Sequence, residues 1–561
     1  MMRGISLLLS VMLAGASTLD AASALRYQGP VHRLRLVLVG DSTVAERTGW
    51  GRAFRLFCGP GIECVNLAVN GRSSKSYIDE GRWTDALAVK ADYYLIQFGH
   101  NDEPGKGPER ETDPSTTYRQ YLSRYIADVR SIGAKPVLIT SLSRRTFKDG
   151  KLYSTLTPYA EAVRAVAAEK QVAVIDLHAR SVALIEKMGE AAWAELSPLD
   201  ASGAVDRTHL NAKGGLLVAP LVAGDLRSVI PELGEHIRST PLMGAAGLRQ
   251  LANSVVAADG SGEYRTVQEA VNAAPQSTSI DSPWMIFVGA GTYREIVYVQ
   301  REKRFLQLVG EDPATTRITY DLQANQPGAD RKPIGTFRTP TIVIDADDFT
   351  AENLTFENAA GPVGQALALR VDGDRAVFRN SRFLGWQDTI FLNRGRHYFE
   401  DCYVEGHVDF IFGGATAFFE RCRIHALRNG YITAASTPAE QPHGFVFANG
   451  RITGEPGVTT YLGRPWRDFA RVSFINTEMS EVVRPEGWHD WDRTERRTTT
   501  HFSEFNSSGP GAAAAKRVSW ATPLTADDVL KLSAREVLKG PDDWDPMRFP
   551  PNPPGPSATT R

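Results

Sequence analysis

The chain is 561 residues long, which is too long for one ordinary hydrophobic core and indicates two or more domains. Its composition, with 42% hydrophobic and 23% charged residues, is typical of a soluble globular protein. The formal net charge of −2 gives no support for general nucleic-acid binding, which would favour a strongly basic face.

The first 24 residues have the layout of a secretory signal peptide. Arg3 precedes an apolar stretch from Ile5 to Ala14, and Ala22-Ser23-Ala24 supplies a small-x-small cleavage pattern. The apolar stretch is too short for a membrane span, and no later segment approaches the length of one. We therefore expect an exported protein, secreted or periplasmic, without a membrane anchor.

Residues 31–230 alternate strand-like and helix-like patterns, which predicts a parallel sheet covered by helices. The expected strands are Leu34–Val39, Cys64–Val69, Tyr93–Phe98, Pro136–Ile139 and Val172–Ile175. The expected helices are Tyr118–Ile132 and Tyr159–Ala168. Sheets of this kind place their functional sites beyond the carboxyl ends of the strands.

Residues suited to ester hydrolysis follow three of these strands. Ser42 follows the first, Gly71 the second and Asn101 the third, while Asp206 and His209 come late in the domain. A serine nucleophile needs a base, a group that orients the base, and donors for the oxyanion. Each residue alone has a plainer explanation, because a serine after a strand is usually a helix cap and an Asp-x-x-His is usually on the surface.

In this order the residues resemble the sequence blocks of the SGNH (GDSL-like) hydrolase family. GDSTVA, NGRSSKSYIDEGRW and LIQFGHNDE look like its rhamnogalacturonan acetylesterase branch, over most of residues 33–226. The resemblance implies a three-layer α/β hydrolase that removes acetyl groups from a pectic polysaccharide without a metal. It also implies catalysis by Ser42, His209 and Asp206, with an oxyanion hole from Gly71 and Asn101. The superfamily also contains lipases and thioesterases, so other esters remain open.

After a linker at residues 231–250, a phenylalanine register recurs. Similar hexapeptides begin at Phe378, Phe399, Phe419, Phe447 and Phe474, and a looser one begins at Phe349. Intervals of 20 to 29 residues suit the coils of a parallel β-helix over residues 251–545. Chance alignment in a β-rich chain is the alternative.

The register places Cys402 and Cys422 on adjacent coils, each three residues after its phenylalanine. Adjacent strands lie about 4.8 Å apart, which is compatible with a disulfide. Cys58 and Cys64 form a second local pair, and an oxidising compartment would permit both disulfides. Buried free thiols are the alternative for each pair.

The same register stacks Asp409 beside Asp388, each ten residues after its phenylalanine. Asp409 interrupts an apolar run from Val408 to Phe412, where an unpaired carboxylate would be costly. Two carboxylates this close do not both ionise readily, so we expect the pKa of one to rise. The pair would supply one general acid and one ionised nucleophile or base. A solvated aspartate ladder is the alternative.

The segment YLGRPWR, residues 461–467, offers partners for this pair. Arg464 could hold Asp409 ionised through a bidentate contact, and Trp466 offers a flat face for a sugar ring. The alternative is that the segment forms a rigid turn with Trp466 in the core. Spacing along the chain alone does not show that the segment reaches the two aspartates.

These residues resemble the pectin methylesterase (pectinesterase) family, a right-handed parallel β-helix. GTYREIVYV, QALALRV, GWQDTIF, GHVDFIFG and YLGRPW match its motifs in order, and the similarity spans about residues 255–545. The resemblance implies that Asp409 is the nucleophile and Asp388 the general acid, then base. It implies that Gln387 helps form the oxyanion hole, with Gln365 nearby.

The resemblance also places Arg464 against Asp409 and Trp466 in the substrate groove, with no metal. Trp386 and His407 depart from the residues that are common in the family at their positions. Both flank the expected groove, so they bear on substrate pattern or pH optimum.

Together the two halves predict a secreted bifunctional pectin esterase that is a monomer and needs no cofactor or metal. Pectin, a galacturonan polysaccharide, is its expected partner. An N-terminal domain that acts on another ester, or only binds carbohydrate, is one alternative. A β-helix lyase or polygalacturonase is another, although a glycosidase would need carboxylates flanking a glycosidic bond. Residues 546–561 are Pro-rich and predicted to be disordered.

Overall fold

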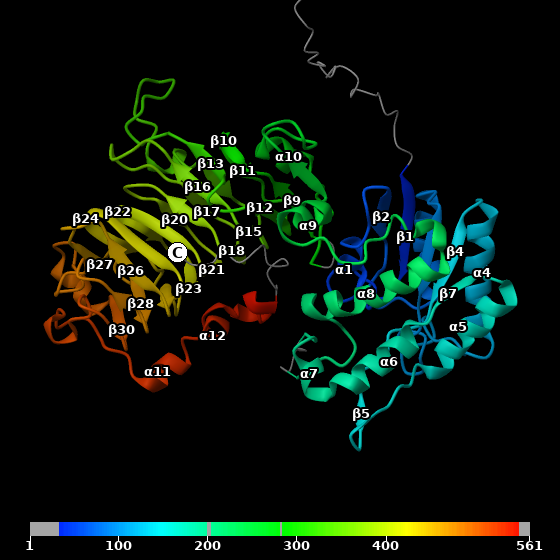
Figure 1. The fold of residues 1–561 in the computed structure, drawn as a ribbon. Coiled ribbons are helices and arrows are strands. Elements are labelled where there is room, and N and C mark those ends of the chain that lie inside the picture. The colour runs from blue at the N-terminus through cyan, green and yellow to red at the C-terminus, as the bar shows by residue number, and fades with distance from the viewer. Residues whose placement is uncertain (1–32, 199–203, 281–282, 549–561) are drawn as a thin grey trace, which may run out of the picture.

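The computed structural model describes residues 33–198, 204–280 and 283–548 (Figure 1). The expected signal peptide and most of the expected tail lie outside the described residues. The first three tail residues, Pro546–Arg548, form the 3₁₀ helix η6 rather than disordered chain. Pro546 is held there because its carbonyl accepts a hydrogen bond from Arg379 at 3.0 Å. Among the described residues, no helix has both the length and the apolar content that crossing a membrane requires.

The N-terminal part is built on a five-stranded parallel sheet with the order β2-β1-β3-β4-β7. Its strands are β1 (Leu34–Gly40), β2 (Ile62–Asn66), β3 (Tyr93–Gln97), β4 (Lys135–Ile139) and β7 (Ala173–Ile175). The larger helices around it are α4 (Thr117–Ser131), α5 (Thr157–Lys170), α6 (Leu177–Met188) and α8 (Ala212–Val229). The predicted strands are therefore confirmed to within a few residues, and β2 begins two residues earlier than expected.

Alternating side chains of this sheet enter two separate cores. Leu36 and Leu38 face α8 and the short helix α1 (Gly51–Arg55), whereas Val37 and Val39 face α4 and α5. This alternation is the reason for the helix–sheet–helix layering, because both faces of a parallel sheet must be covered.

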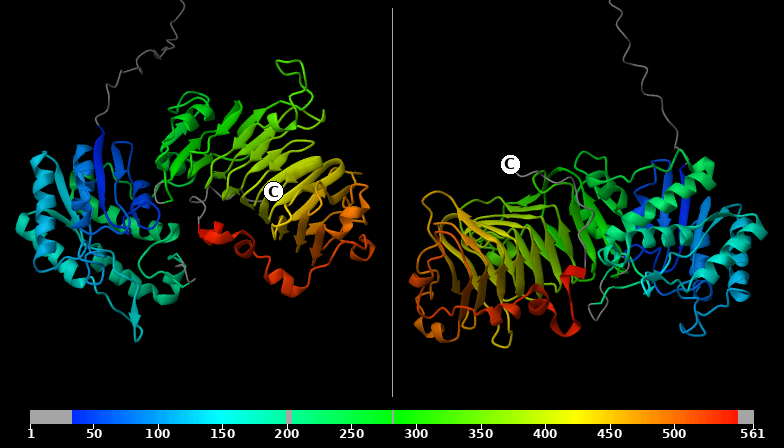
Figure 2. Two further views of the ribbon diagram at one scale, coloured as in Figure 1. Left: turned by 180° about the vertical axis from the view of Figure 1, so that it is seen from behind. Right: turned by 60° about the horizontal axis from the view of Figure 1, so that its bottom comes forward.

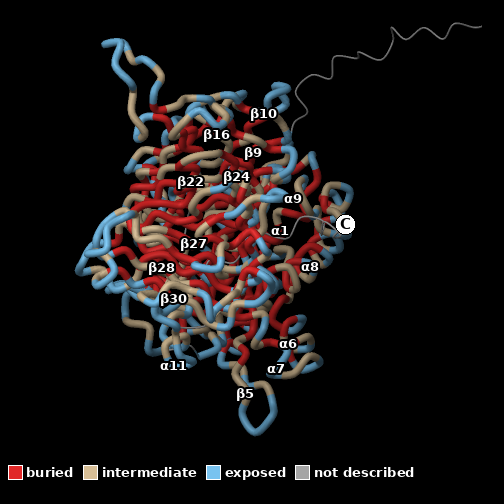
Figure 3. Tube along the Cα trace, turned by 90° about the vertical axis from the view of Figure 1, so that its left-hand side faces the viewer, coloured by how far each residue is buried: buried red, intermediate tan, exposed pale blue. Residues whose placement is uncertain are grey.

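The C-terminal part is a parallel β-helix (Figures 1 and 2). One wall has ten strands: β8 (Ser254–Val256), β9 (Trp284–Val288), β12 (Leu306–Gly310), β15 (Thr350–Glu352), β18 (Ala376–Arg379), β21 (Arg396–Glu400), β23 (Thr416–Glu420), β25 (Phe445–Ala448), β28 (Arg471–Ile475) and β30 (His501–Phe505). The other walls share a thirteen-stranded sheet: β10 (Gly291–Arg294), β11 (Val297–Val299), β13 (Thr316–Tyr320), β14 (Ile342–Ile344), β16 (Thr355–Asn358), β17 (Leu369–Val371), β19 (Arg382–Leu384), β20 (Ile390–Leu392), β22 (Tyr403–Gly413), β24 (Arg423–Ala435), β26 (Arg451–Gly454), β27 (Thr460–Pro465) and β29 (Glu478–Met479). Figure 3 shows the continuous buried interior that these walls enclose.

The phenylalanine register is confirmed over five successive coils. Phe378 pairs with Phe399, and the same register continues through Phe419, Phe447 and Phe474. Their rings stack with centroids 4.4 to 4.7 Å apart. Phe349 differs from the prediction, because Ala351 is the residue that pairs with Phe378.

A ladder of residues with left-handed backbone turns each coil out of the ten-stranded wall. It lies two residues after the phenylalanine position and comprises Asn353, Asn380, Asp401, Arg421, Asn449, Asn476 and Asn506, with φ between 41° and 57°. Asparagine tolerates this conformation better than most residues. Side-chain amides bond along the ladder, as from Asn506 to Asn476 at 2.9 Å and from Asn476 to Asn449 at 3.1 Å.

The structure contains neither of the disulfides considered from the sequence, and Cys58, Cys64, Cys402 and Cys422 are free thiols. Cys402 and Cys422 do lie side by side on adjacent coils, as the register predicts, and burial together with the contact to Cys402 raises the pKa of Cys422. The Cys402 thiol donates to the Glu400 carbonyl at 3.4 Å, and the Cys422 thiol donates to the Phe399 carbonyl at 3.5 Å.

The linker between the two parts packs tightly against both. Its helix α9 (Gly244–Leu251) contributes Leu248 and Leu251 to an apolar cluster, which we call the junction cluster. The cluster also contains Leu56 from the N-terminal part and Met285, Phe287 and Val309 from β9 and β12. Gln250 adds hydrogen bonds to the carbonyls of Arg55 at 2.6 Å and Cys58 at 2.7 Å.

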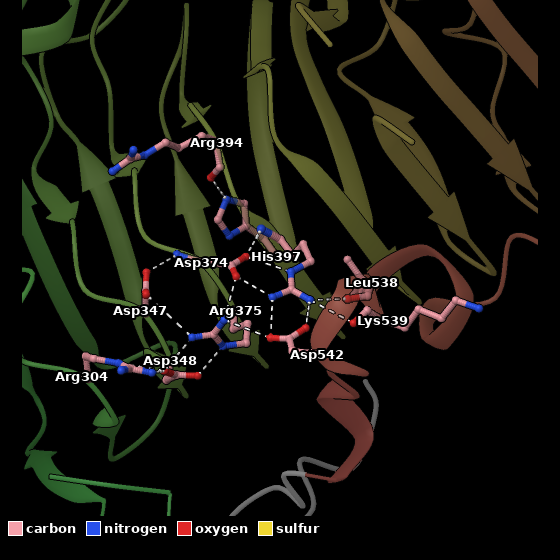
Figure 4. A network of polar contacts seen from close by, with 11 residues as sticks. Arg304, Asp347, Asp348, Asp374, Arg375, Arg394, His397, Leu538, Lys539 and Asp542 are labelled. Carbon is pink, nitrogen blue, oxygen red and sulfur yellow. Dashed lines mark hydrogen bonds and ion pairs between the residues drawn. The ribbon is translucent and has the colours of Figure 1, made fainter. Parts of the chain in front are cut away.

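The C-terminal segment returns along the β-helix and is held there by a clamp of ion pairs (Figure 4). It carries α11 (Ala526–Leu530) and α12 (Ala534–Leu538), and Val537 and Leu538 cover outward-facing side chains of the ten-stranded wall. Beyond α12, Asp542 accepts from Arg396 at 2.9 Å and from Arg375 at 3.2 Å. We call these three residues the C-terminal clamp.

Candidate active sites

The first site lies at the carboxyl end of β1. His209 Nε2 is 2.8 Å from Ser42 Oγ, and His209 Nδ1 is 2.7 Å from Asp206 Oδ2. The sequence predicted these three residues as one group, although 167 residues separate Ser42 from His209. This chain of contacts is the geometry with which an imidazole takes a proton from a serine hydroxyl.

Asp206 is held as an anion by its own loop. Burial alone would raise the pKa of Asp206, but hydrogen bonds from the His209 side chain and from the backbone N–H groups of His209 and Thr208 lower it below its ordinary value. Those N–H groups lie 2.9 and 2.6 Å from Asp206 Oδ1. The carboxylate therefore both anchors the turn and orients the imidazole.

Gly71 and Asn101 lie on neighbouring loops after β2 and β3. Gly71 has a φ of 76°, which favours glycine, and no atom lies within 4 Å of the position that a Cβ would occupy. Asn101 Nδ2 donates to the Arg72 carbonyl at 3.1 Å, so the amide ties its loop to the chain beside Gly71.

The second site lies on the outer surface of the thirteen-stranded sheet, where Asp388 and Asp409 occupy adjacent coils. The pairs Ile390–Ile411 and Phe391–Phe412 set the register, and Asp388 N donates to the Val408 carbonyl at 3.1 Å. Both aspartates are buried and have left-handed backbone, with φ of 65° for Asp388 and 52° for Asp409. The register of β22 shifts between Val408 and Ile411, so Asp409 sits at an interruption of the strand.

Arg464, on β27, reaches Asp409 as the sequence suggested. Its Nε and Nη2 atoms lie 2.9 and 2.7 Å from the two carboxylate oxygens, which is a bidentate contact. The guanidinium is stacked between two rings, with its central carbon 3.9 Å from the ring centroid of Tyr431 and 3.7 Å from that of Trp491. Arg464 therefore has little freedom to leave Asp409.

The two carboxyl groups differ in proton affinity. Burial, followed by the negative charge of Asp409, raises the pKa of Asp388 to about 8, and Arg464 only partly opposes this rise. Burial also raises the pKa of Asp409, but the hydrogen bonds and charge of Arg464 oppose it directly. A proton shared by the pair therefore resides on Asp388, and Asp409 is the anion.

The two predicted glutamines lie beside this pair. Gln365 and Gln387 form a parallel bridge between adjacent coils, and Ala366 N donates to the Gln387 carbonyl at 3.1 Å. Both side chains are partly exposed, and Gln387 directly precedes Asp388. Their amides are thus available on the surface that carries the carboxylates.

Aromatic side chains border the second site. Trp466 is half-buried and packs against Phe412 at a centroid distance of 5.6 Å. Trp386 forms an edge-to-face contact with His407 at 5.9 Å, and the guanidinium of Arg428 lies 4.9 Å from the Trp386 ring. Burial lowers the pKa of His407.

Sequence reasoning did not find Tyr431 and Trp491. Tyr431 lies 33 residues before Arg464 and Trp491 lies 27 residues after it, and no local sequence pattern links either residue to Arg464. The repeat contained one signal for Tyr431 that was not used. Tyr431 pairs with Tyr461 on the adjacent coil, and Tyr461 lies three residues before Arg464.

One group among the described residues has side chains grouped closely enough to hold a metal ion, namely His489, Asp490 and Asp492. Two of them have other partners: His489 Nδ1 accepts from Trp491 N at 3.0 Å, and Asp490 pairs with Arg497 at 2.7 Å.

Comparison with known families divides the chain in the same way as the two sites. The Pectinesterase family model matches residues 253–540, and the GDSL-like Lipase/Acylhydrolase family model matches residues 38–215. The aspartate pair of the second site thus lies within the Pectinesterase match, and Ser42 and His209 lie within the GDSL-like match.

Relatives with known names match about half of the chain. Pectinesterase 31 of Arabidopsis thaliana is 41% identical over 280 residues, which cover 49% of this chain and 88% of the relative. Pectinesterase QRT1 of the same plant is 40% identical over 300 residues, covering 52% and 78%. The solved structure of pectin methylesterase from carrot is 32% identical and superimposes with a TM-score of 0.50, over 54% of this chain and 98% of that one.

Proposed function

Since this chain belongs to the pectinesterase family of carboxylic ester hydrolases, we propose that its β-helix hydrolyses the methyl esters of galacturonate in pectin. The observation that carries this proposal is the aspartate pair, with Asp409 held by Arg464 and Asp388 of raised pKa beside it. One anion and one acid on adjacent coils are what ester cleavage without a separate base requires.

In the proposed first step, the Asp409 carboxylate attacks the ester carbonyl carbon. The amides of Gln387 and Gln365 donate to the oxyanion that forms. Asp388 gives its proton to the departing methoxide, so methanol leaves and an acyl–Asp409 anhydride remains. Arg464 holds the attacking carboxylate in position during this step.

In the proposed second step, Asp388 is ionised and acts as a base. It takes a proton from water as the water oxygen attacks the acyl carbon of the anhydride. Cleavage of the bond to Asp409 releases galacturonate, and Asp388 keeps the proton for the next cycle. Trp466 is proposed to support a sugar ring in the groove.

We propose that the N-terminal part is a second esterase, which removes acetyl groups from rhamnogalacturonan or pectin. His209 takes the Ser42 proton as Oγ attacks the acetyl carbonyl, while the Gly71 N–H and the Asn101 amide donate to the oxyanion. His209 then gives that proton to the departing sugar oxygen, which leaves as a hydroxyl, and water hydrolyses the acetyl-serine. An N-terminal part that acts on a different ester is the second candidate.

We further propose that the chain works as a monomer on pectin outside the cytoplasm after removal of residues 1–24. Its working units would be residues 31–230 and 251–545. Joining two esterases in one chain would keep one active site near the polysaccharide that the other has bound.

The deciding experiment measures methanol and acetate release together from methylated and acetylated pectin. Intact protein is compared with Ser42→Ala and Asp409→Ala. We expect Ser42→Ala to lose only acetate release and Asp409→Ala to lose only methanol release. Each variant thereby serves as the folding control of the other.

Other results would overturn parts of the proposal. Methanol release that survives Asp409→Ala would exclude the assigned nucleophile. Intact protein that releases methanol but no acetate would exclude pectin acetyl esters as the substrate of the N-terminal part.

A further inference from the structure

A buried arginine lies directly behind the loop that carries Asp206 and His209. Arg145 follows β4 and its side chain is 3% exposed. Its guanidinium donates to the carbonyl oxygens of Thr208 and Asp206, both at 3.2 Å, and to that of His209. All three carbonyls belong to the turn that presents the imidazole to Ser42.

The rest of Arg145 is fixed as firmly as its guanidinium tip. Nε donates to Ser197 Oγ at 3.1 Å, and the backbone N–H donates to the Arg207 carbonyl at 2.8 Å. The guanidinium lies 5.5 Å from the ring centroid of the buried Trp193. Its planar fork of donors therefore has one orientation, and that orientation matches the carbonyls of the turn.

Two other contacts reach the turn from outside, one atom each: Asp206 N donates to the Pro198 carbonyl at 2.9 Å, and Arg144 donates to Thr208 Oγ1, whereas Arg145 holds three carbonyls at once. The Asp206 side chain closes the turn internally, by accepting from Thr208 N and His209 N. That closure fixes the shape of the turn, but it does not fix the distance from the turn to Ser42. Beyond the turn, Leu210 N donates to the Thr48 carbonyl at 2.8 Å.

We infer that Arg145 is a positioning residue for the N-terminal esterase, which holds the Asp206–His209 turn so that His209 Nε2 stays in contact with Ser42 Oγ. The inference rests on the proposed Ser42 esterase and adds to it a residue that acts only through the turn. A displacement of about 1 Å in such a contact lowers a rate by about 100-fold.

The test uses the whole chain and 4-nitrophenyl acetate, a small activated ester that reports on Ser42 whatever the polysaccharide is. Arg145→Met should lower kcat about 100-fold and leave KM within about threefold, because the turn moves while the ester site remains. Arg145→Lys should recover about tenfold of that loss, because an ammonium can reach some of the carbonyls.

Two measurements separate positioning from loss of folding. Methanol release from the β-helix should stay unchanged in both variants, and the thermal unfolding of the N-terminal part is recorded for each. Arg180→Met is the matched control, since Arg180 makes an exposed ion pair with Asp225 and should alter neither kcat nor KM.

A kcat for Arg145→Met within threefold of wild type overturns the inference. So does an equal loss of kcat in both Arg145 variants that matches the fraction of unfolded N-terminal part. If acetylated pectin is not a substrate while 4-nitrophenyl acetate is cleaved in a Ser42-dependent way, only the proposed substrate fails. If the intact protein cleaves neither ester, the proposed activity and the inference fail together.

Discussion

Asp388 and Asp409 are both buried, both left-handed and one coil apart. A regular strand would direct alternate side chains inward and outward, and an aspartate in the inward set would lie in the core. The left-handed backbone interrupts that alternation at Asp409 within β22, whereas left-handed Asp388 lies in the turn between β19 and β20. The resulting strain costs about 1–3 kcal/mol per residue, and such strain is typical of functional sites.

Methanol release should decline on the alkaline side as Asp388 loses its proton. The pKa of Asp388 is raised to about 8, so the acid form is present below that pH and is lost above it. We expect the rate to fall about tenfold per pH unit above the pKa. A pH–rate profile for methanol release from about pH 6 to about pH 10 checks this, and a flat profile would exclude Asp388 as the acid.

Arg464→Met should lower the rate of methanol release, and the loss should be largest at acid pH. Removing the cation leaves burial to raise the pKa of Asp409 without opposition, so a larger share of this carboxyl is protonated and cannot attack. Arg464→Lys keeps the charge but loses the bidentate contact, so it should lower the rate with a smaller displacement of the acid limb. Equal profiles for the two variants would contradict this role for the charge.

The residues of both sites could be predicted from the sequence to different degrees. The coil register alone places Asp388 beside Asp409, because a repeat converts spacing along the chain into stacking. The Arg464 contact could only be suggested, since the repeat does not say where a loop side chain points. Trp491 and Arg145 carry no pattern, because their roles depend on tertiary contacts alone, and Tyr431 is marked only by its pairing with Tyr461 on the adjacent coil.

At the scale of elements, the left-handed ladder explains why the coils turn where they do. Five of its seven members are asparagine, and each lies two residues after the phenylalanine position. The phenylalanines could be found from the sequence because the same residue type recurs on successive coils, where the rings stack. The assignment of Phe349 to the register was wrong, because the small residue Ala351 occupies the equivalent position on the coil before Phe378.

Asn476 offers a test of the ladder. Asn476→Val should lower the free energy of unfolding of the β-helix by about 2 kcal/mol, because a β-branched residue opposes positive φ and loses both ladder hydrogen bonds. Asn476→Gly should cost less, since glycine accepts the backbone and loses only the bonds. Urea unfolding monitored by methanol-releasing activity compares them. An equal cost for the two substitutions would show that backbone strain is not the cause.

At the scale of the whole molecule, the junction cluster makes one body of two folds. The sequence identified residues 231–250 as a linker between two unlike patterns, but hydrophobic periodicity does not reveal which surface a helix will cover. Burial of Leu248, Leu251 and Leu56 against Phe287 means that neither fold is covered fully without the other. The junction cluster therefore ties the two folds to each other.

Leu251→Asp should uncouple the two folds. A carboxylate placed among apolar side chains must stay hydrated or take up a proton, and both outcomes oppose docking. We expect the substitution to lower the temperature of the first unfolding transition and to separate it from the second in scanning calorimetry. Leu530→Asp is the control, because Leu530 is 76% exposed and its replacement should leave the trace unchanged. An unaltered trace for Leu251→Asp would show that the cluster does not couple the folds.

The C-terminal clamp has a consequence for how the molecule is made. Asp542 leaves the ribosome after every coil of the β-helix, and the outward-facing Val377, Tyr398 and Phe418 stay uncovered until Leu538 follows them. A nascent chain therefore carries an apolar strip beside Arg375 and Arg396 from the time that Val377 is made until Leu538 follows. Only a finished chain can close that strip, so a prematurely terminated product would expose a surface that chaperones and proteases recognise.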